Sequence, residues 1–491
     1  MGSVSRIAFY LVLLTKPQSH HCIGRNFAFT SLRPSYRRQR FLATRANAAE
    51  EKFLRWAQAN LIPIPTINPH EDIHDDSDLK KIATVIGDGT QVVAISEGCH
   101  NSREMLTLCH KMVRLLVEFG FNTIISETAF PEARLIFDYV QGKYSPTTKE
   151  EKEEMYRQGL NQMYSQWVEG RDLIEWMREY NQDHDNILHY YGSDIGGFYK
   201  DWKTPFQRIF DYLNTVDEAF ASTLHSELKP YLDRMGQNAR LVYQFELSRF
   251  EQCELEAILD NALHEMDSNR EEYVNAASGN DFEYEWARQS LESMRLAEHY
   301  YRNYAQRCDP DTSKLGGLNG REMAMYRNVL WALKERQKRQ DHPIKAIIIH
   351  HVIHTKTECQ YQDKTWGFFT PAGHMLKESL GEKLYVIGMA YGGGNYWKEW
   401  QKGPDVRSIA RIPPASPDGL EEFMELIPQS GQCYFLPWKE GPSETKPWLS
   451  TLYSMRENDY FVKIVPREWD ACFYFKSVQP ATAPSGDEGK D

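Results

Sequence analysis

The chain has no long hydrophobic run and few cysteines. Its longest purely apolar stretch, Ile7 to Leu14, is eight residues, whereas a membrane-spanning helix needs about 18. The eight cysteines are widely spaced and include no Cys-x-x-Cys pair. This spacing argues against a disulfide framework and against a zinc ribbon. We therefore expect no membrane span, and a reducing compartment or the mitochondrial matrix fits the cysteine usage.

Acidic residues are absent from the first part of the chain, where the first is Glu50. The same stretch holds eight cations: Arg6, Lys16, Arg25, Arg33, Arg37, Arg38, Arg40 and Arg45. An Arg-rich, acid-free, Ser-containing N-terminus is typical of an organelle transit peptide. Residues 1–45 are therefore interpreted as a transit-like leader, disordered or removed, which predicts the mitochondrial matrix. A secretory signal around Ile7–Leu14, and a cytoplasmic location, are the alternatives.

The rest of the chain is acidic. The formal net charge is −12, and residues 50–491 alone carry 49 basic and 69 acidic residues. A nucleic-acid binder needs a basic face for the phosphates, so no nucleic-acid partner is expected. The sequence also contains no Gly-x-Ser-x-Gly elbow, Walker loop or Gly-x-Gly-x-x-Gly turn. Their absence excludes the serine-hydrolase, P-loop and Rossmann interpretations.

Apolar runs alternate with amphipathic helical patterns, which is typical of a mainly parallel sheet flanked by helices. The predicted strands are 91–96, 122–126, 187–191, 345–350, 383–387, 432–437 and 471–475. Residues 201–340 show only helical patterns and are predicted to be a helical subdomain that covers the carboxyl edge of the sheet. The expected fold is thus an α/β domain in two parts, 46–200 and 341–480, with an all-helical insertion or cap and a disordered tail, 481–491.

Chemistry-bearing residues follow three of these strands directly. The first runs into Glu97 and His100, the second ends on Glu127, and the fourth ends in a run that contains His351 and His354. Ligands and catalytic groups in parallel sheets lie just beyond the carboxyl ends of the strands. If these strands are neighbours, carboxylates and imidazoles converge on one pocket.

Each of these residues also has an ordinary structural explanation. Glu127 is a candidate helix cap or solvated loop residue, and His100 is a candidate N-cap. His351 and His354 can serve as hydrogen-bonding groups in a loop. Taken jointly, however, a histidine between carboxylates can deprotonate water, because a carboxylate orients the ring and stabilises the imidazolium. Further imidazoles can then hydrogen-bond a developing oxyanion.

Seven segments, in order and over most of the chain, resemble the motifs of the erythromycin esterase family. They are 96–104, 127–133, 167–181, 191–194, 321–331, 351–354 and 469–474. The first stands where the family has Gly-Glu-x-x-His-Gly-x-x-Glu, and 351–354 stands where it has His-Asn-x-His. The resemblance implies a metal-independent hydrolase without a cofactor, acting on a small-molecule lactone or other carboxylic ester.

The resemblance also implies roles for individual residues. By this resemblance His100 would act as general base on water, and Glu97, Glu127, His351 and His354 would complete the site. We hypothesise that Glu97 orients the His100 ring, and that His351, His354 and Glu127 bind water and polarise the carbonyl. Cys109 occupies a position where macrolide-cleaving members have a functional arginine, so Arg103 and Arg321 are the candidate substrate-binding cations. Ser96 and Asn101 replace motif glycines, and Val352 replaces an asparagine.

Two other classes of function stay open at this point. The same imidazoles and carboxylates suit a non-catalytic protein that binds zinc, non-haem iron or haem. Metal-assisted peptide hydrolysis is the third hypothesis. No metal site is assigned in the favoured interpretation.

Overall fold

The computed structural model describes residues 48–71, 77–160, 162–185, 187–197, 201–236, 239–303, 318–358, 361–363, 367–398, 408–415, 419–428, 431, 433–450, 452 and 468–484. The predicted leader lies outside these residues, so it stays a prediction, as does the location drawn from it. The described residues from 48 onward form one compact unit.

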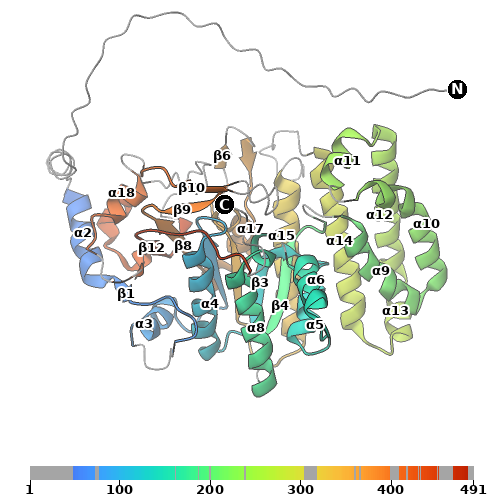
Figure 1. The fold of residues 1–491 in the computed structure, drawn as a ribbon, viewed down its shortest axis with the longest axis horizontal. Coiled ribbons are helices and arrows are strands. Elements are labelled where there is room, and N and C mark those ends of the chain that lie inside the picture. The colour runs from blue at the N-terminus through green and yellow to red at the C-terminus, as the bar shows by residue number, and fades with distance from the viewer. Residues whose placement is uncertain are drawn as a thin grey trace, which may run out of the picture. The chain divides into compact units, whose positions relative to one another are not determined.

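An eight-stranded sheet forms the centre of this unit (Figure 1). Six neighbouring strands are parallel, and one edge continues through two antiparallel pairings. In spatial order the strands are β1 (Ile62–Ile64), β11 (Cys433–Leu436), β12 (Ala471–Phe475), β8 (Leu384–Tyr391), β2 (Val92–Glu97), β5 (Ala346–His351), β3 (Thr123–Ala129) and β4 (His189–Asp194). The predicted α/β class with a mainly parallel sheet is confirmed.

Both faces of the sheet are covered, which explains why its strands have continuous apolar runs rather than alternating ones. On β5, Ile347 and Ile349 pack into one core, whereas Ala346 and Ile348 pack into the other. The helices on the Ile347 side are α3 (Ser77–Ile86), α4 (Arg103–Glu118), α5 (Ala133–Val140), α6 (Lys149–Gly159), α7 (Gln162–Ser165) and α8 (Val168–Asp183). The opposite side includes α2 (Ala48–Asn60), α15 (Leu318–Lys338), α17 (Ala372–Leu380), α18 (Leu420–Met424) and α19 (Lys446–Leu449).

All regular secondary structure of the described residues between 201 and 303 is helical, as predicted. They form α9 (Lys203–Val216), α10 (Glu218–Arg234), α11 (Ala239–Phe245), α12 (Arg249–Ser268), α13 (Arg270–Ala276) and α14 (Asp281–Asn303). These helices pack mostly on one another, and α14 lies beside α15 (Figure 1). α15 carries the insertion back to the sheet, where it packs on β4.

Seven of the eight sheet strands coincide with predicted strands. β1 was not predicted, because three residues are too few for a pattern. Neither were two small hairpins, β6 (Tyr361–Asp363) with β7 (Gly367–Phe369) and β9 (Asn395–Lys398) with β10 (Ser408–Arg411). The packed chain also extends past residue 480, where the sequence places the start of a disordered tail: Ala481 is buried and hydrogen-bonded. Residues 485–491 of that tail lie outside the described residues.

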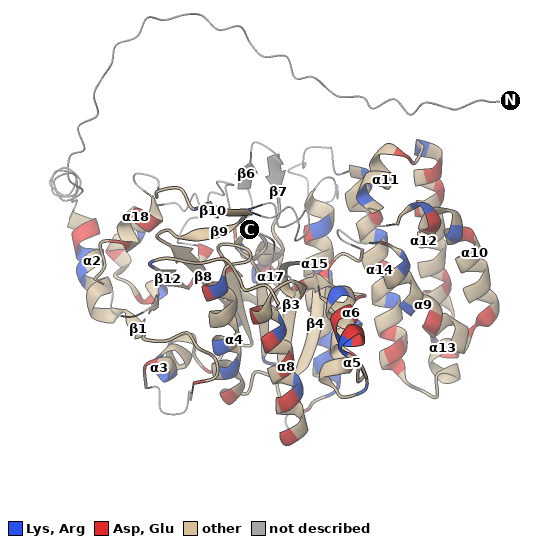
Figure 2. Ribbon diagram, in the orientation of Figure 1, with Lys and Arg blue, Asp and Glu red and all other residues tan. Residues whose placement is uncertain are grey.

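Charged side chains of both signs are interspersed on the outer helices, while the visible strands are almost free of them (Figure 2). No helix among the described residues is long and apolar enough to cross a membrane. The described cysteines, which are Cys99, Cys109, Cys253, Cys433 and Cys472, form no disulfide with one another. Charged residues within the sheet are therefore exceptional and need a specific explanation.

Candidate functional site

Buried charged and polar residues collect at the carboxyl ends of four neighbouring strands. Glu97 ends β2 and lies in register with His351 at the end of β5. Glu127 lies near the end of β3, and Asp194 ends β4. Each of these four residues is only 1% exposed. A charge buried this deeply is costly unless it is paired, so the partners of each group decide what the cluster can do.

His100 lies in the turn after β2 and contacts two of these residues. Its Nδ1 is 3.2 Å from Glu97 Oε2, and its ring centroid is 4.2 Å from that of His351. The His100 side chain keeps 13% of its surface exposed. Burial raises the pKa of Glu97, and the nearby His100 only partly opposes this. The geometry therefore gives His100 an orienting carboxyl on Nδ1.

Glu127 holds three elements of the site together. Its Oε1 accepts a hydrogen bond of 2.8 Å from Arg321 Nη2 on α15 and lies 3.3 Å from His354 Nε2. Its Oε2 accepts the backbone N–H of His351 at 2.7 Å. Burial alone would raise the pKa of Glu127, but His354 and Arg321 outweigh it and hold the pKa well below its usual range. Glu127 is therefore an ionised anchor for both β5 and α15.

His354 lies on α16 (Val352–Thr355), directly after β5, between two carboxylates. Its Nδ1 is 2.6 Å from Glu322 Oε1, and its Nε2 faces Glu127. Burial lowers the pKa of His354, but Glu322 and Glu127 more than compensate and raise it to about 10. The ring is thus an imidazolium with both nitrogens facing carboxylates. This differs from the predicted role, since neither N–H is left to polarise a carbonyl.

His351 is the neutral counterpart of His354. Burial, reinforced by His100, lowers the pKa of His351 well below its ordinary value. Its Nδ1 accepts the backbone N–H of Ile353 at 3.3 Å. Because Nδ1 is the acceptor, the proton of the neutral ring belongs on Nε2. His351 therefore presents an N–H donor.

Arg321, which was predicted to bind substrate, pairs with two carboxylates of the cluster. Its Nε and Nη2 donate to the two oxygens of Asp194 at 2.9 and 2.7 Å, in addition to the bond with Glu127. Burial alone would lower the pKa of Arg321, but the nearby carboxylates of Asp194 and Glu127 outweigh burial and hold the pKa well above its ordinary value. Such a bidentate pair fixes the position of a guanidinium.

Arg103, the other predicted substrate-binding cation, does not join the cluster. It begins α4, its side chain is 51% exposed, and its Nε lies 3.9 Å from Glu169 of α8. Two members that the sequence reasoning did not assign are Asp194 and Glu322. The signal for Asp194 was the one used for Glu127, a carboxylate after an apolar strand, whereas Glu322 was signalled only by its neighbour Arg321.

A serine–histidine pair also lies beneath the cluster. His350 Nε2 is 2.7 Å from Ser193 Oγ, and both residues are buried. Ser193 Oγ donates its proton to the carbonyl of Ser126 at 2.9 Å, so His350 must be the donor toward the serine. Burial lowers the pKa of His350 to about 3. The pair therefore stabilises the sheet and lacks the proton arrangement of an activated nucleophile.

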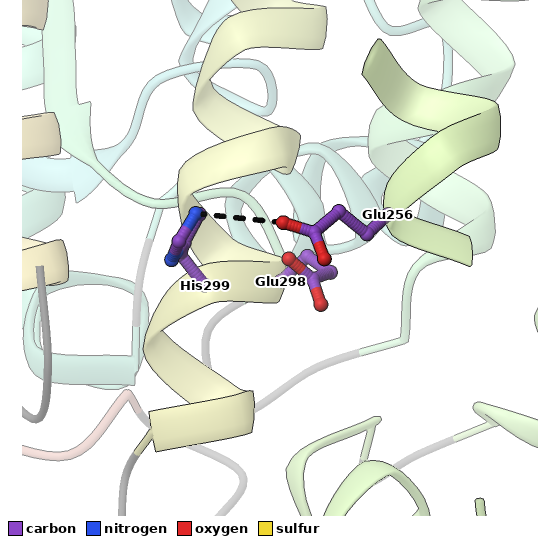
Figure 3. Close-up of side chains that lie close together, drawn as sticks. All are labelled: Glu256, Glu298 and His299. Atoms are coloured by element: carbon purple, nitrogen blue, oxygen red, sulfur yellow. Dashed lines mark ion pairs between the residues drawn. The ribbon is translucent and has the colours of Figure 1, made fainter. Parts of the chain in front are cut away.

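Potential metal ligands group elsewhere in the described residues. Glu256 on α12 and Glu298 and His299 on α14 point toward one another (Figure 3). Arg295 and Arg302 already pair with both carboxylates. Two guanidinium groups neutralise the charge that a cation would require, so this group is an ion-pair network between two helices.

A hollow of about 630 Å³ among the described residues is also separate from the cluster. It lies along α5 and α6, with Leu135 and Met155 among its lining residues, and none of the residues above lines it. In its wall, Arg134 and Arg208 both pair with Asp138. The strand-end cluster is therefore the better candidate for chemistry.

Comparisons with known proteins point to one family. A family model described as erythromycin esterase matches residues 117–478. A curated Escherichia coli protein named erythromycin esterase type II is 24% identical over 356 residues, which is 69% of this chain and 77% of that protein.

Solved structures share the fold. A Bacillus cereus protein superimposes with a TM-score of 0.70 at 19% identity, over 89% of this chain and 100% of the other. A succinoglycan biosynthesis protein gives 0.69 at 19% identity, over 89% and 99%. A mutant of the erythromycin esterase EreC in its open conformation gives 0.63 at 16% identity, over 86% and 98%.

Proposed function

Since this chain belongs to the erythromycin esterase family, we propose that it hydrolyses a small-molecule lactone or other carboxylic ester with a water activated by His100. The observation that carries this proposal is the contact of His100 with Glu97 on one side and His351 on the other. The carboxyl group of Glu97 accepts a hydrogen bond from the Nδ1–H of His100 and so orients the ring. The Nε2 lone pair of His100 then takes a proton from water.

His351 supplies the second function that ester hydrolysis needs. Attack of water on the carbonyl carbon forms the new C–O bond and places negative charge on the carbonyl oxygen. The neutral imidazole of His351, with its proton on Nε2, donates a hydrogen bond to that oxygen and needs no change of protonation to do so. The imidazolium of His100 afterwards returns the proton to the departing alkoxide, so that acid and alcohol are released.

Glu127, His354 and Arg321 support this pair rather than touching substrate. Glu127 fixes the backbone of His351, and its charge is balanced by His354 and Arg321. His354 and Arg321 thus already supply positive charge within the cluster. A bound metal ion would add further positive charge beside them, which favours hydrolysis over the metal- or haem-binding alternative.

The test is hydrolysis of a panel of aryl esters, simple lactones and a macrolide. His100→Ala should lower kcat by roughly 10²- to 10⁴-fold, the usual contribution of a general base. His342→Ala is the matched control, because that histidine is exposed and precedes β5 at the opposite edge of the sheet. Equal rates for wild type and His100→Ala would reject the proposal. Loss of wild-type activity on dialysis against a chelator would instead support the metal-assisted alternative.

A further inference from the structure

The last described residues of the chain lie against the turn that carries His100. We name residues 478–482 the C-terminal strap. The backbone N–H of Ala481 donates to the Asn101 carbonyl at 2.8 Å, and Arg103 N–H donates to the Gln479 carbonyl at 2.9 Å. Ser102 also forms an isolated bridge with Pro480. The strap therefore pairs with the residues that directly follow His100.

Glu104 adds a side-chain contact to this backbone pairing. Its Oε2 accepts the N–H of Gln479 at 2.6 Å from the first turn of α4. This is a hydrogen bond to a carboxylate, the stronger kind. Through Gln479, Glu104 ties the position of the strap to the start of α4, where the His100 turn ends.

The other side of the strap is attached to elements far from the turn. Val478 exchanges backbone hydrogen bonds with Gly393 and Asn395, and Trp397 Nε1 donates to the Ala481 carbonyl at 2.8 Å. At its end, the Thr482 carbonyl accepts the N–H of Val168 at the start of α8. The strap thus connects the turn to β9 and α8, so it has fixed points on three sides.

We propose that the C-terminal strap positions His100 for proton transfer and that Glu104 is a positioning residue of the reaction. This inference rests on the proposed role of His100 as base. Within the turn, Asn101 has a φ of 59°, and its carbonyl accepts a hydrogen bond from the strap. A displacement of about 1 Å in a catalytic group can lower the rate by 10²-fold. Contacts of the strap that hold this turn in place therefore affect kcat.

Two truncations of the full chain test the strap. One removes residues 481–491 and deletes the contacts of Ala481 and Thr482, and the matched control removes only 485–491. The longer truncation should lower kcat by about 10- to 100-fold with little change in KM, while the control keeps the wild-type kcat. Carbethoxylation of His100, measured by mass spectrometry with exposed His342 as internal reference, should change rate in the longer truncation only.

Side-chain variants test Glu104 separately. Glu104→Ala should lower kcat, and Glu104→Gln should restore part of the loss, since an amide oxygen still accepts the Gln479 N–H. Glu118→Ala, at the exposed opposite end of α4, is the control. A purely structural role would lower Tm in Glu104→Ala and leave kcat unchanged below the transition.

The outcomes separate this inference from the proposed function. An unchanged carbethoxylation rate of His100 after removal of 481–491 overturns the positioning role, whatever the activity. A changed rate with an unaltered kcat also overturns it and leaves the proposed function intact. If the wild type hydrolyses no ester, the proposed function fails. The carbethoxylation rate of His100 in the two truncations still measures whether the strap positions that side chain.

Discussion

The imidazole rings of His100 and His351 lie 4.2 Å apart, centroid to centroid, with their planes tilted by 35°. They come from the ends of β2 and β5, two strands that are adjacent in the sheet but far apart in the sequence. The rings differ in environment, because His351 is 1% exposed whereas His100 retains contact with the surface. One ring is thus suited to donate a hydrogen bond and the other to exchange a proton.

Ser193→Ala should retain hydrolytic activity within about threefold of wild type, because its hydroxyl proton is held by Ser126 and removal of a true nucleophile would cost orders of magnitude more. Steady-state kinetics on the best ester of the panel measures this. A loss beyond 10³-fold would show that the serine attacks the substrate, and would transfer the reaction from His100 to the Ser193–His350 pair.

Arg321→Leu should destabilise the protein by about 3–5 kcal/mol, because it leaves the carboxylates of Glu127 and Asp194 buried without their common cation. Urea unfolding at neutral pH gives the free energy of unfolding. The control is Arg55→Leu, since Arg55 is largely exposed and pairs weakly with Glu51; its effect should stay below about 1 kcal/mol. A change as small as that for Arg321→Leu would mean that the network is not maintained in solution.

The stabilisation that His354 gives to the folded protein should be lost in alkaline solution. Its pKa is about 10 in the folded protein and about 6.5 in the unfolded chain, so the folded state binds the extra proton. The stabilisation is therefore complete below pH 6.5 and is lost as the pH rises through 10. Thermal unfolding of wild type and His354→Gln between pH 6 and 10.5 measures it. Their Tm difference should shrink with rising pH, and a constant difference would contradict the assignment.

Asn101→Ala should be more destabilising than Asn101→Gly. Asn101 has a φ of 59°, a conformation that costs about 1–2 kcal/mol for an alanine and nothing comparable for glycine. Both variants lose the hydrogen bond from Trp167 Nε1 to the Asn101 side chain. Chemical denaturation of the two proteins isolates the backbone contribution. Equal stabilities would indicate that the turn relaxes out of the left-handed region.

The sequence determined most of the fold because the pattern is strong where a strand is buried on both faces. Runs such as 345–350 could hardly form anything but interior strands, and the length of the helical patterns identified the insertion. The short strand β1 and the hairpins lacked such a pattern. The association of 479–481 with the His100 turn was not predictable either, because it is made mainly by backbone groups that carry no side-chain signal.

Glu97, His100, Glu127 and His351 were nominated from the sequence alone, since charged and imidazole groups directly after apolar strands are unusual. Their division of labour was decided only by tertiary structure. His354 is a cation and His351 is neutral because one faces two carboxylates and the other faces His100 and apolar surroundings. Likewise Arg321 is occupied because folding brings Asp194 to it. Sequence supplies the groups, but charge state depends on distances and burial that exist only once the strands lie side by side.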